Sequence, residues 1–291
     1  MKTLAHCLLG LAAASVASAA AIGQALRLNT GGPGNMRVAG GSAAAQGRAP
    51  FLVRLELVSE SGRALCGGSI VDSTTVVTAG HCVYNVETES VRPASEIYVY
   101  YGSVATNSTD YVQATSVTLH PDFDLSMFRN DIAVLRIPEL EFVTGRVEAA
   151  TVYDGIIIPG SPMAIYGWGI TGSNGDSADL PTTLQTQTVY VSMPQLCIIV
   201  EPRYDSANGT QICADNNYNV TVDICQGDSG TGTTIRYNGK HYLAGLVSFG
   251  TNLFGDVGCG ERGSYGLYTR ISYYLPWIRS LGSNPTSGPT T

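Results

Sequence analysis

The 291-residue sequence predicts an all-β fold, a barrel or a sandwich, with one helix near its end. Short runs of β-branched and aromatic residues alternate with Gly, Asn and Asp, as strands separated by turns do. Charged residues make up only 13% of the chain and glycine is abundant at 34 residues. This composition is more typical of a β-rich extracellular protein than of a helical bundle or a disordered chain.

Residues 1–19 are predicted to be a secretory signal peptide. Lys2 supplies a positive charge, Leu8–Val16 a short apolar stretch, and Ala17-Ser-Ala19 a small-residue cleavage site. The alternative, a membrane anchor, is disfavoured because the stretch is too short and too rich in alanine. Residues 20–37 lack a periodic apolar pattern and are predicted to form a flexible propeptide.

Strand patterns occupy most of the chain after residue 38. Strands are predicted over Phe51–Leu57, Thr74–Thr78, Ile97–Tyr101, Ile132–Ile137, Val189–Val191 and Tyr242–Phe249. The helix is expected around Ile271–Leu281, and residues 284–291, rich in Ser, Thr, Pro and Gly, are expected to be a flexible tail.

The cysteine count predicts disulfides. One of the seven cysteines, Cys7, lies in the signal peptide, and an even number remains in the exported chain. No two have the close spacing typical of zinc ligands. The sequence by itself leaves the pairing open among Cys66, Cys82, Cys197, Cys213, Cys225 and Cys259.

The net charge of -7 argues against nucleic acid as a partner, because phosphate binding requires clustered Lys and Arg and no such cluster is present. After removal of the signal peptide no apolar run could span a bilayer. We expect no cofactor and no bound metal.

Three short segments carry chemistry: Thr78-Ala-Gly-His-Cys82, Asp131-Ile-Ala-Val-Leu135 and Gly227-Asp-Ser-Gly230. A serine hydroxyl barely ionises near neutral pH and needs a neutral imidazole within hydrogen-bond reach to take its proton. A buried carboxylate then selects the useful imidazole tautomer. In this order, with cysteines beside two of them, the segments resemble the trypsin/chymotrypsin family of serine proteases very closely.

The resemblance extends from residue 38 to about residue 283. It implies two packed six-stranded antiparallel β-barrels with a C-terminal helix, at about 38–148 and 149–283. The family's catalytic residues match His81, Asp131 and Ser229, and its oxyanion hole matches the backbone N–H groups of Gly227 and Ser229. The implied disulfides are Cys66–Cys82, Cys197–Cys213 and Cys225–Cys259.

The segment Arg37-Val-Ala-Gly-Gly41 is similar to the family's activation site. Cleavage after Arg37 would free the ammonium group of Val38. Asp228, next to the nucleophile, would be buried and would need a cation as its partner. The resemblance therefore implies a zymogen.

The substrate pocket is expected to select a basic side chain. Asp223 matches the acidic base of the trypsin pocket, although it could also be an ordinary loop residue, and Gly250 and Gly266 match its walls. Ile224 is a departure from the small polar residue usual there, and we expect it to favour Arg over Lys. The candidate substrate-binding residues are Asp223, Ile224, Ser248, Phe249, Gly250 and Gly266.

A second departure follows the nucleophile, where the chain reads Ser229-Gly-Thr-Gly232 and the family usually continues with Gly-Pro. Thr231 puts catalytic efficiency in question rather than mechanism. Three N-x-Ser/Thr sequons are candidate glycosylation sites, occupied or unused, and these are Asn107, Asn208 and Asn219.

The sequence thus predicts a secreted, monomeric serine endopeptidase that is made as a zymogen and cleaves after Arg or Lys. Its expected partners are protein or peptide substrates, with protein protease inhibitors as further candidates. One alternative is a peptidase of the same family with another preference. Another is a catalytically silent homologue that binds or inhibits a partner, although such proteins usually lack a residue of the triad.

Overall fold

The computed structural model describes residues 41–60, 62–169, 180–215, 224–252 and 263–290. Several predictions therefore concern residues outside the described part of the chain. They are the signal peptide, the propeptide, Arg37, Val38, Asn219, Asp223 and Cys259.

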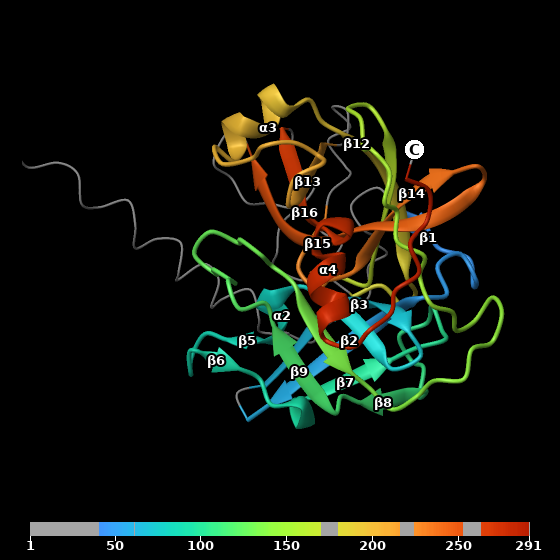
Figure 1. Cartoon of the computed structure of the whole chain (residues 1–291). Coiled ribbons are helices and arrows are strands. Elements are labelled where there is room, and N and C mark those ends of the chain that lie inside the picture. The colour runs from blue at the N-terminus through green and yellow to red at the C-terminus, as the bar shows by residue number, and fades with distance from the viewer. Residues whose placement is uncertain (1–40, 61, 170–179, 216–223, 253–262, 291) are drawn as a thin grey trace, which may run out of the picture.

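Two seven-stranded antiparallel sheets form the body of the molecule, the first curved into a half-barrel and the second containing a closed six-stranded barrel (Figure 1). This architecture confirms the predicted all-β fold. The first sheet has the order β8-β7-β2-β3-β4-β10-β9. Its strands are β2 (Leu52–Ser59), β3 (Gly62–Asp72), β4 (Thr75–Thr78), β7 (Ile97–Tyr100), β8 (Tyr111–Gln113), β9 (Ser116–Leu119) and β10 (Ala133–Arg136).

The two edge strands of the first sheet, β8 and β9, are separated by only two residues. The N–H of Ala114 donates to the carbonyl of Ile97 on one side of the sheet, and the N–H of Thr115 donates to the carbonyl of Arg136 on the other. This bent stretch therefore joins the two edges of the sheet.

The second sheet has the order β1-β12-β11-β14-β15-β16-β13, and β12 also pairs with β13, which closes six strands into a barrel. Its strands are β1 (Ser42–Ala43), β11 (Pro162–Gly167), β12 (Gln185–Val191), β13 (Gln211–Asp215), β14 (Gly232–Tyr237), β15 (Lys240–Asn252) and β16 (Ser264–Arg270). A separate pair is formed by β5 (Tyr84–Asn85) and β6 (Ser90–Val91).

Alternating apolar residues produce these strands and fill the barrels. In β2 the side chains of Val53, Leu55 and Leu57 are buried in the first core. In the second barrel Met163 and Ile165 of β11 occupy the equivalent inward positions. Period-2 patterning of this kind directs one face of each strand to the core.

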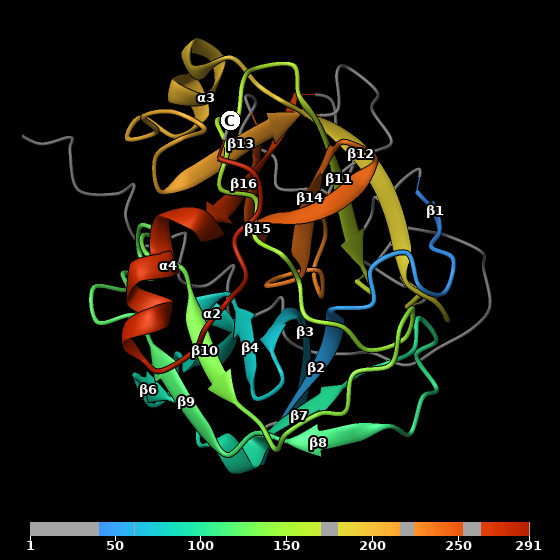
Figure 2. The ribbon, with the colours of Figure 1, turned by 45° about the vertical axis from the view of Figure 1, so that its right-hand side comes forward.

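Two elements cross the expected division at residue 148. β1 pairs with β12 of the second barrel. The helix α4 (Ile271–Ser280) lies beside β10 of the first sheet (Figure 2). Its side chains Ile271, Leu275 and Ile278 are buried in the first barrel's core. Each half of the chain therefore donates one terminal element to the other half.

Other short helices are α2 (Gly80–Val83), the 3-10 turn η1 (Ala94–Glu96) and α3 (Pro194–Val200). Only the C-terminal helix was predicted from the sequence, whereas α2, η1 and α3 were not. No helix in the described part of the chain is long and apolar enough to cross a membrane.

The C-terminal segment differs from the predicted flexible tail. The carbonyl of Thr286 accepts a hydrogen bond from the Val152 N–H at 2.8 Å, and the Gly288 N–H donates to the Val152 carbonyl at 2.7 Å. Ser283 and Asn284 both donate to the carboxylate of Asp72. Residues 283–290 therefore lie along the connection between the barrels, where backbone hydrogen bonds hold them.

Two of the three expected disulfides are confirmed, Cys66–Cys82 and Cys197–Cys213. Cys225 is also disulfide-bonded, and its expected partner lies outside the described residues.

Candidate active site

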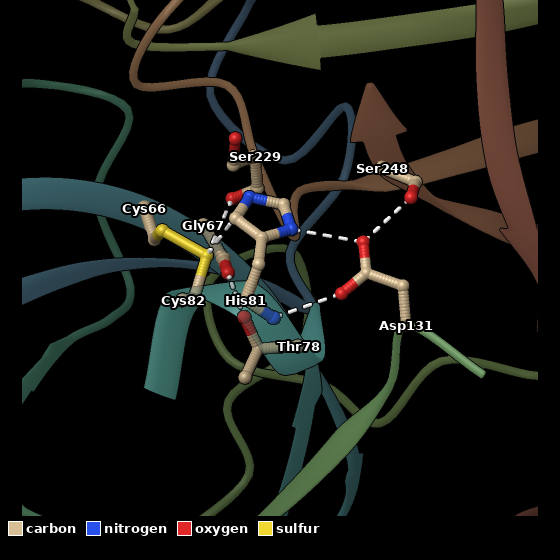
Figure 3. Close-up of a disulfide and its surroundings, with 8 residues drawn as sticks. All are labelled: Cys66, Gly67, Thr78, His81, Cys82, Asp131, Ser229 and Ser248. Carbon is tan, nitrogen blue, oxygen red and sulfur yellow. Dashed lines mark hydrogen bonds and ion pairs between the residues drawn. A yellow bond between two sulfur atoms is a disulfide. The ribbon is translucent and has the colours of Figure 1, made fainter. Parts of the chain in front are cut away.

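His81 lies on α2, which follows β4 after one residue. The backbone just before it, at Gly80, packs closely against neighbouring side chains. A Cβ on Gly80 would lie 2.9 Å from the side chains of Leu119 and Phe123. The backbone N–H of His81 donates to Oδ1 of Asp131 at 2.8 Å, and its ring Nδ1 pairs with Oδ2 at 2.8 Å. One carboxylate thus holds both the backbone and the ring of the histidine (Figure 3).

Asp131 is buried and surrounded by donors from the second barrel. Oγ of Ser248 donates to its Oδ2 at 2.5 Å, and Oγ1 of Thr269 donates to its backbone carbonyl at 2.8 Å. Burial by itself raises the pKa of the Asp131 carboxyl. The charge of His81 and the hydrogen bonds from His81 and Ser248 outweigh burial and hold this pKa below its ordinary value.

Ser229 lies in a tight loop between Cys225 and β14. Gly227 and Gly230 on either side of it have φ angles of 95° and 76°, which only glycine adopts without strain. The carbonyl of Ser229 accepts a hydrogen bond from the N–H of Gly67 in the first barrel at 2.7 Å. The serine loop is therefore attached directly to the barrel that carries the histidine.

The ring of His81 and the backbone of Ser229 both contact the Cys66–Cys82 disulfide. Sγ of Cys82 lies 4.0 Å from Nε2 of His81 and 3.6 Å from the carbonyl oxygen of Ser229. A disulfide sulfur carries no proton, so these are packing contacts rather than hydrogen bonds. Figure 3 places Ser229 near the Nε2 edge of the imidazole, while Asp131 holds the Nδ1 edge.

Two backbone N–H groups near Ser229 are available to a ligand. Among the described residues, neither the Gly227 N–H nor the Ser229 N–H donates to a protein acceptor. Unused N–H groups beside a candidate nucleophile can bind the oxygen that becomes negative during acyl transfer.

Asp228 is buried on the other side of the serine loop. Its Oδ1 accepts from the Gly169 N–H at 2.8 Å and its Oδ2 from the Cys225 N–H at 2.9 Å. A Cβ on Gly167 would lie 1.7 Å from Oδ1. Gly167 and Gly169 were not predicted as site residues. Their signal is a pair of glycines at the end of a strand pattern, which indicates close backbone approach.

The predicted pocket walls lie opposite each other on neighbouring strands, since Gly250 of β15 pairs with Gly266 of β16. A Cβ on Gly250 would make only ordinary contact, 3.8 Å from Cγ1 of Ile224. A Cβ on Gly266 would lie 2.5 Å from the hydroxyl of Tyr268. The missing side chain at 266 therefore makes room for Tyr268, whereas a Cβ at 250 would fit beside Ile224 without a clash.

An aromatic group lines the His81 side of the site. The ring of Phe128 meets the imidazole edge-on at 5.6 Å between centroids and lies 4.9 Å from the ring of Phe249. Phe128 has a φ of 45°. The sequence analysis included Phe249 but missed Phe128, because no local pattern relates a loop phenylalanine to a histidine far away in the chain.

The two described sequons differ in their surroundings. The side chain of Asn208 pairs with the backbone of Ile157, accepting from its N–H at 2.9 Å and donating to its carbonyl at 2.9 Å. Asn107 is exposed, and its side chain makes no hydrogen bond within the described residues.

No group of His, Cys, Asp or Glu side chains in the described ranges could hold a metal ion.

Comparison with known proteins agrees with this geometry. The trypsin family profile matches residues 38–278. The trypsin Tyr p 3.0101 of Tyrophagus putrescentiae is 31% identical over 243 residues, 83% of this chain and 79% of the relative. Trypsin-1 of Astacus astacus is 32% identical over 222 residues, 74% of this chain and 86% of the relative.

A third relative, the trypsin of Sus scrofa, is 29% identical over 247 residues, 84% of this chain and 94% of the relative. The family match covers both barrels and the histidine, aspartate and serine segments, and two of the relatives exceed 30% identity over 83% and 74% of this chain. The chain therefore belongs to the trypsin family and is a serine endopeptidase.

Proposed function

We propose that this endopeptidase is secreted as a zymogen, that it cleaves peptide bonds after Arg and Lys, and that Ser229, His81 and Asp131 form its catalytic triad. The observation that supports the triad best is the double attachment of His81 to Asp131, with the Nε2 edge of the ring packed on the same sulfur as Ser229.

In the proposed mechanism Oγ of Ser229 attacks the substrate carbonyl carbon while Nε2 of His81 takes the hydroxyl proton. Asp131 keeps the other ring nitrogen protonated and stabilises the imidazolium that forms. The N–H groups of Gly227 and Ser229 bind the developing oxyanion, and each such donor contributes about 3 to 4 kcal/mol to lowering the barrier.

The proton on His81 then passes to the leaving amine, and the acyl group stays on Ser229. Water enters, gives a proton to Nε2, and its oxygen attacks the ester carbon. Collapse of the second tetrahedral intermediate releases the carboxylic acid and restores the serine hydroxyl.

Activation is proposed to follow cleavage after Arg37. The new ammonium of Val38 would pair with Asp228, whose hydrogen bonds to Gly169 and Cys225 already come from two segments that flank the site. An ammonium partner favours the charged carboxylate, and so it would stabilise the loop that presents Gly227 and Ser229.

Specificity is proposed to depend on Asp223, which would pair with a basic substrate side chain at the base of the pocket. The absence of a side chain at Gly250, where a Cβ would meet no atom closer than 3.8 Å, supports entry of a long side chain beside Ile224. Ile224 is buried next to that space and offers no hydrogen bond from its side chain to a lysine ammonium. Arg is therefore the preferred residue.

The proposed setting is extracellular, because residues 1–19 have the pattern of a signal peptide. We propose that the mature protein is a monomer and a glycoprotein. Its partners are protein or peptide substrates and protein protease inhibitors.

Labelling and sequencing of the activated protein test the proposal. The purified full chain is cleaved with an Arg-specific protease, its N-terminus is sequenced, and it is treated with a serine-directed phosphonate. We expect a new N-terminus at Val38, phosphonylation at Ser229 by mass spectrometry, and cleavage of a peptide library after Arg and Lys. Ser229→Ala serves as the unlabelled control.

A negative result in each of the three measurements would contradict a different part of the proposal. If the wild-type protein has its new N-terminus at Val38 but does not react with the phosphonate, it is a catalytically silent homologue. Labelling without cleavage after basic residues overturns the specificity alone. An active enzyme that starts elsewhere overturns the proposed activation.

A further inference from the structure

The two barrels meet beside Ser229 through glycines that face hydroxyl side chains. A Cβ on Gly67 would lie 1.9 Å from Oγ1 of Thr231, and a Cβ on Gly232 would lie 2.2 Å from Oγ of Ser69. Gly67 and Ser69 belong to β3 of the first barrel, while Thr231 immediately precedes β14 of the second. Each hydroxyl therefore occupies the space that the opposite glycine leaves.

The hydroxyl of Thr231 contributes volume rather than a hydrogen bond. The side chain is fully buried, and its Oγ1 has no hydrogen-bond partner among the described residues. Ser69, in the reciprocal contact, is buried in the same way. A buried hydroxyl without a partner is unfavourable, so its benefit must come from the contact that it makes.

Gly67, on which Thr231 packs, is connected to both Ser229 and His81. Its N–H donates to the Ser229 carbonyl at 2.7 Å, and its carbonyl accepts from Oγ1 of Thr78 at 2.7 Å. Its neighbour Cys66 is bonded to Cys82, which follows His81 in the chain. A shift of Gly67 toward the second barrel would therefore move the histidine relative to the serine.

We propose that Thr231 is a positioning residue for catalysis, because its side chain, packed on Gly67, sets the separation at which the His81 barrel meets the Ser229 loop. In this chain Thr231 and Gly232 stand where the family usually has Gly-Pro. Both differences from the family pattern fit the facing barrel. The side chain of Thr231 packs on Gly67, and the lack of a side chain at Gly232 leaves room for Ser69. The inference rests on the proposed triad.

The test compares two threonines of the same strand region. Thr233 is also fully buried, but its Oγ1 donates to the Gly245 carbonyl at 3.3 Å inside the second barrel, away from Gly67. Thr231→Ala, Thr233→Ala and Thr231→Ser are activated, their active sites are counted with a serine-directed phosphonate, and kcat and KM are measured on one Arg peptide.

We expect Thr231→Ala to lower kcat per active site about tenfold with KM unchanged, because misplacement of reacting groups weakens only the transition state. Thr233→Ala should reduce thermal stability but leave both constants unchanged. Thr231→Ser keeps an oxygen over Gly67 and should restore kcat.

Equal kcat values for Thr231→Ala and Thr233→Ala would overturn the inference, and so would a Thr231→Ser variant as slow as Thr231→Ala. A wild type that the phosphonate does not label would instead overturn the proposed triad, and this inference with it. The labelling step therefore separates the two failures.

Discussion

The side chain of Ile224 lies where the proposed pocket would distinguish between two basic residues. It is buried, with its Cγ1 3.8 Å from the place of a Cβ on Gly250. A lysine ammonium needs several compact polar partners, whereas the arginine fork can pair with one carboxylate through two hydrogen bonds. A hydroxyl at position 224 would supply the partner that lysine lacks.

We expect Ile224→Ser to raise kcat/KM for a Lys peptide relative to its Arg counterpart by about fivefold, the worth of one hydrogen bond of about 1 kcal/mol. Matched peptides that differ only in the basic residue measure the ratio. The same ratio in variant and wild type would show that Ile224 does not influence the choice.

At Asn208 the side-chain pairing bears on modification. Both of its hydrogen bonds go to Ile157, so the Nδ2 hydrogen that donates lies on the same edge of the amide as Oδ1. A glycan converts this group into a secondary amide, whose trans preference places the sugar on that same edge. The pairing and the glycan therefore exclude each other.

We expect a glycan on Asn107, whose side chain is exposed and unpaired within the described residues, and none on Asn208. Enzymatic deglycosylation in heavy-oxygen water, followed by peptide mass spectrometry, reports the occupancy of each site. A heavy label at position 208 in the folded, secreted protein would contradict the exclusion.

Among the elements, the C-terminal segment shows how one carboxylate holds a stretch of chain in place. Burial raises the pKa of Asp72, but hydrogen bonds from Ser283, Asn284 and its own turn outweigh it and leave the pKa below its ordinary value. Because the pKa of Asp72 is lower in the folded state, the attachment stabilises the fold fully at pH values above the ordinary aspartate pKa of about 3.9. That contribution is lost as the pH falls through the lower pKa of the folded state.

We therefore expect the protection factors of the Val152 and Gly288 amides, whose N–H groups hold the segment, to decrease as the pH falls below about 4, once the slower intrinsic exchange in acid is corrected for. Asp72→Asn should produce fast exchange already at neutral pH, after correction for the intrinsic rate. Asp124→Asn is the matched control, because that partly exposed aspartate also has a lowered pKa but lies far from the segment in the chain. Exchange at Gly288 that is the same in Asp72→Asn and the control would refute the role of Asp72.

For the whole molecule, the contacts between barrels predict that the two halves unfold together. The indole N–H of Trp168, from the second barrel, donates to the carbonyl of Val104 in the first at 2.8 Å. Thr106 donates its N–H to the Thr182 carbonyl at 3.0 Å across the same boundary. Asp131 adds its bonds to Ser248 and Thr269.

The chain contains only two tryptophans, so Trp277→Phe leaves Trp168 as the single reporter of the boundary. We expect its fluorescence change in urea to coincide with the loss of far-ultraviolet circular dichroism, as in one cooperative transition. A Trp168 transition at clearly lower urea would mean that the barrels separate before either unfolds.

Much of the fold follows from local pattern. The predicted strands at Ile97–Tyr101 and Ile132–Ile137 agree with β7 and β10 to within a residue at each end, because short runs of apolar and aromatic residues are visible in a short window. The helix α3 was not predicted because its seven residues are too few to show a helical periodicity. The closure of the first barrel by Ala114 and Thr115 has no local signature at all.

By itself the sequence determined the strand pattern, the histidine, aspartate and serine segments and, through the family resemblance, the disulfides of Cys66 and Cys197. Such features depend on neighbouring residues or on short motifs. Only the tertiary structure decided that Thr231 packs on Gly67 and that the C-terminal segment lies against Asp72. These contacts join residues far apart in the chain, so they follow from how the barrels pack rather than from any pattern within one segment.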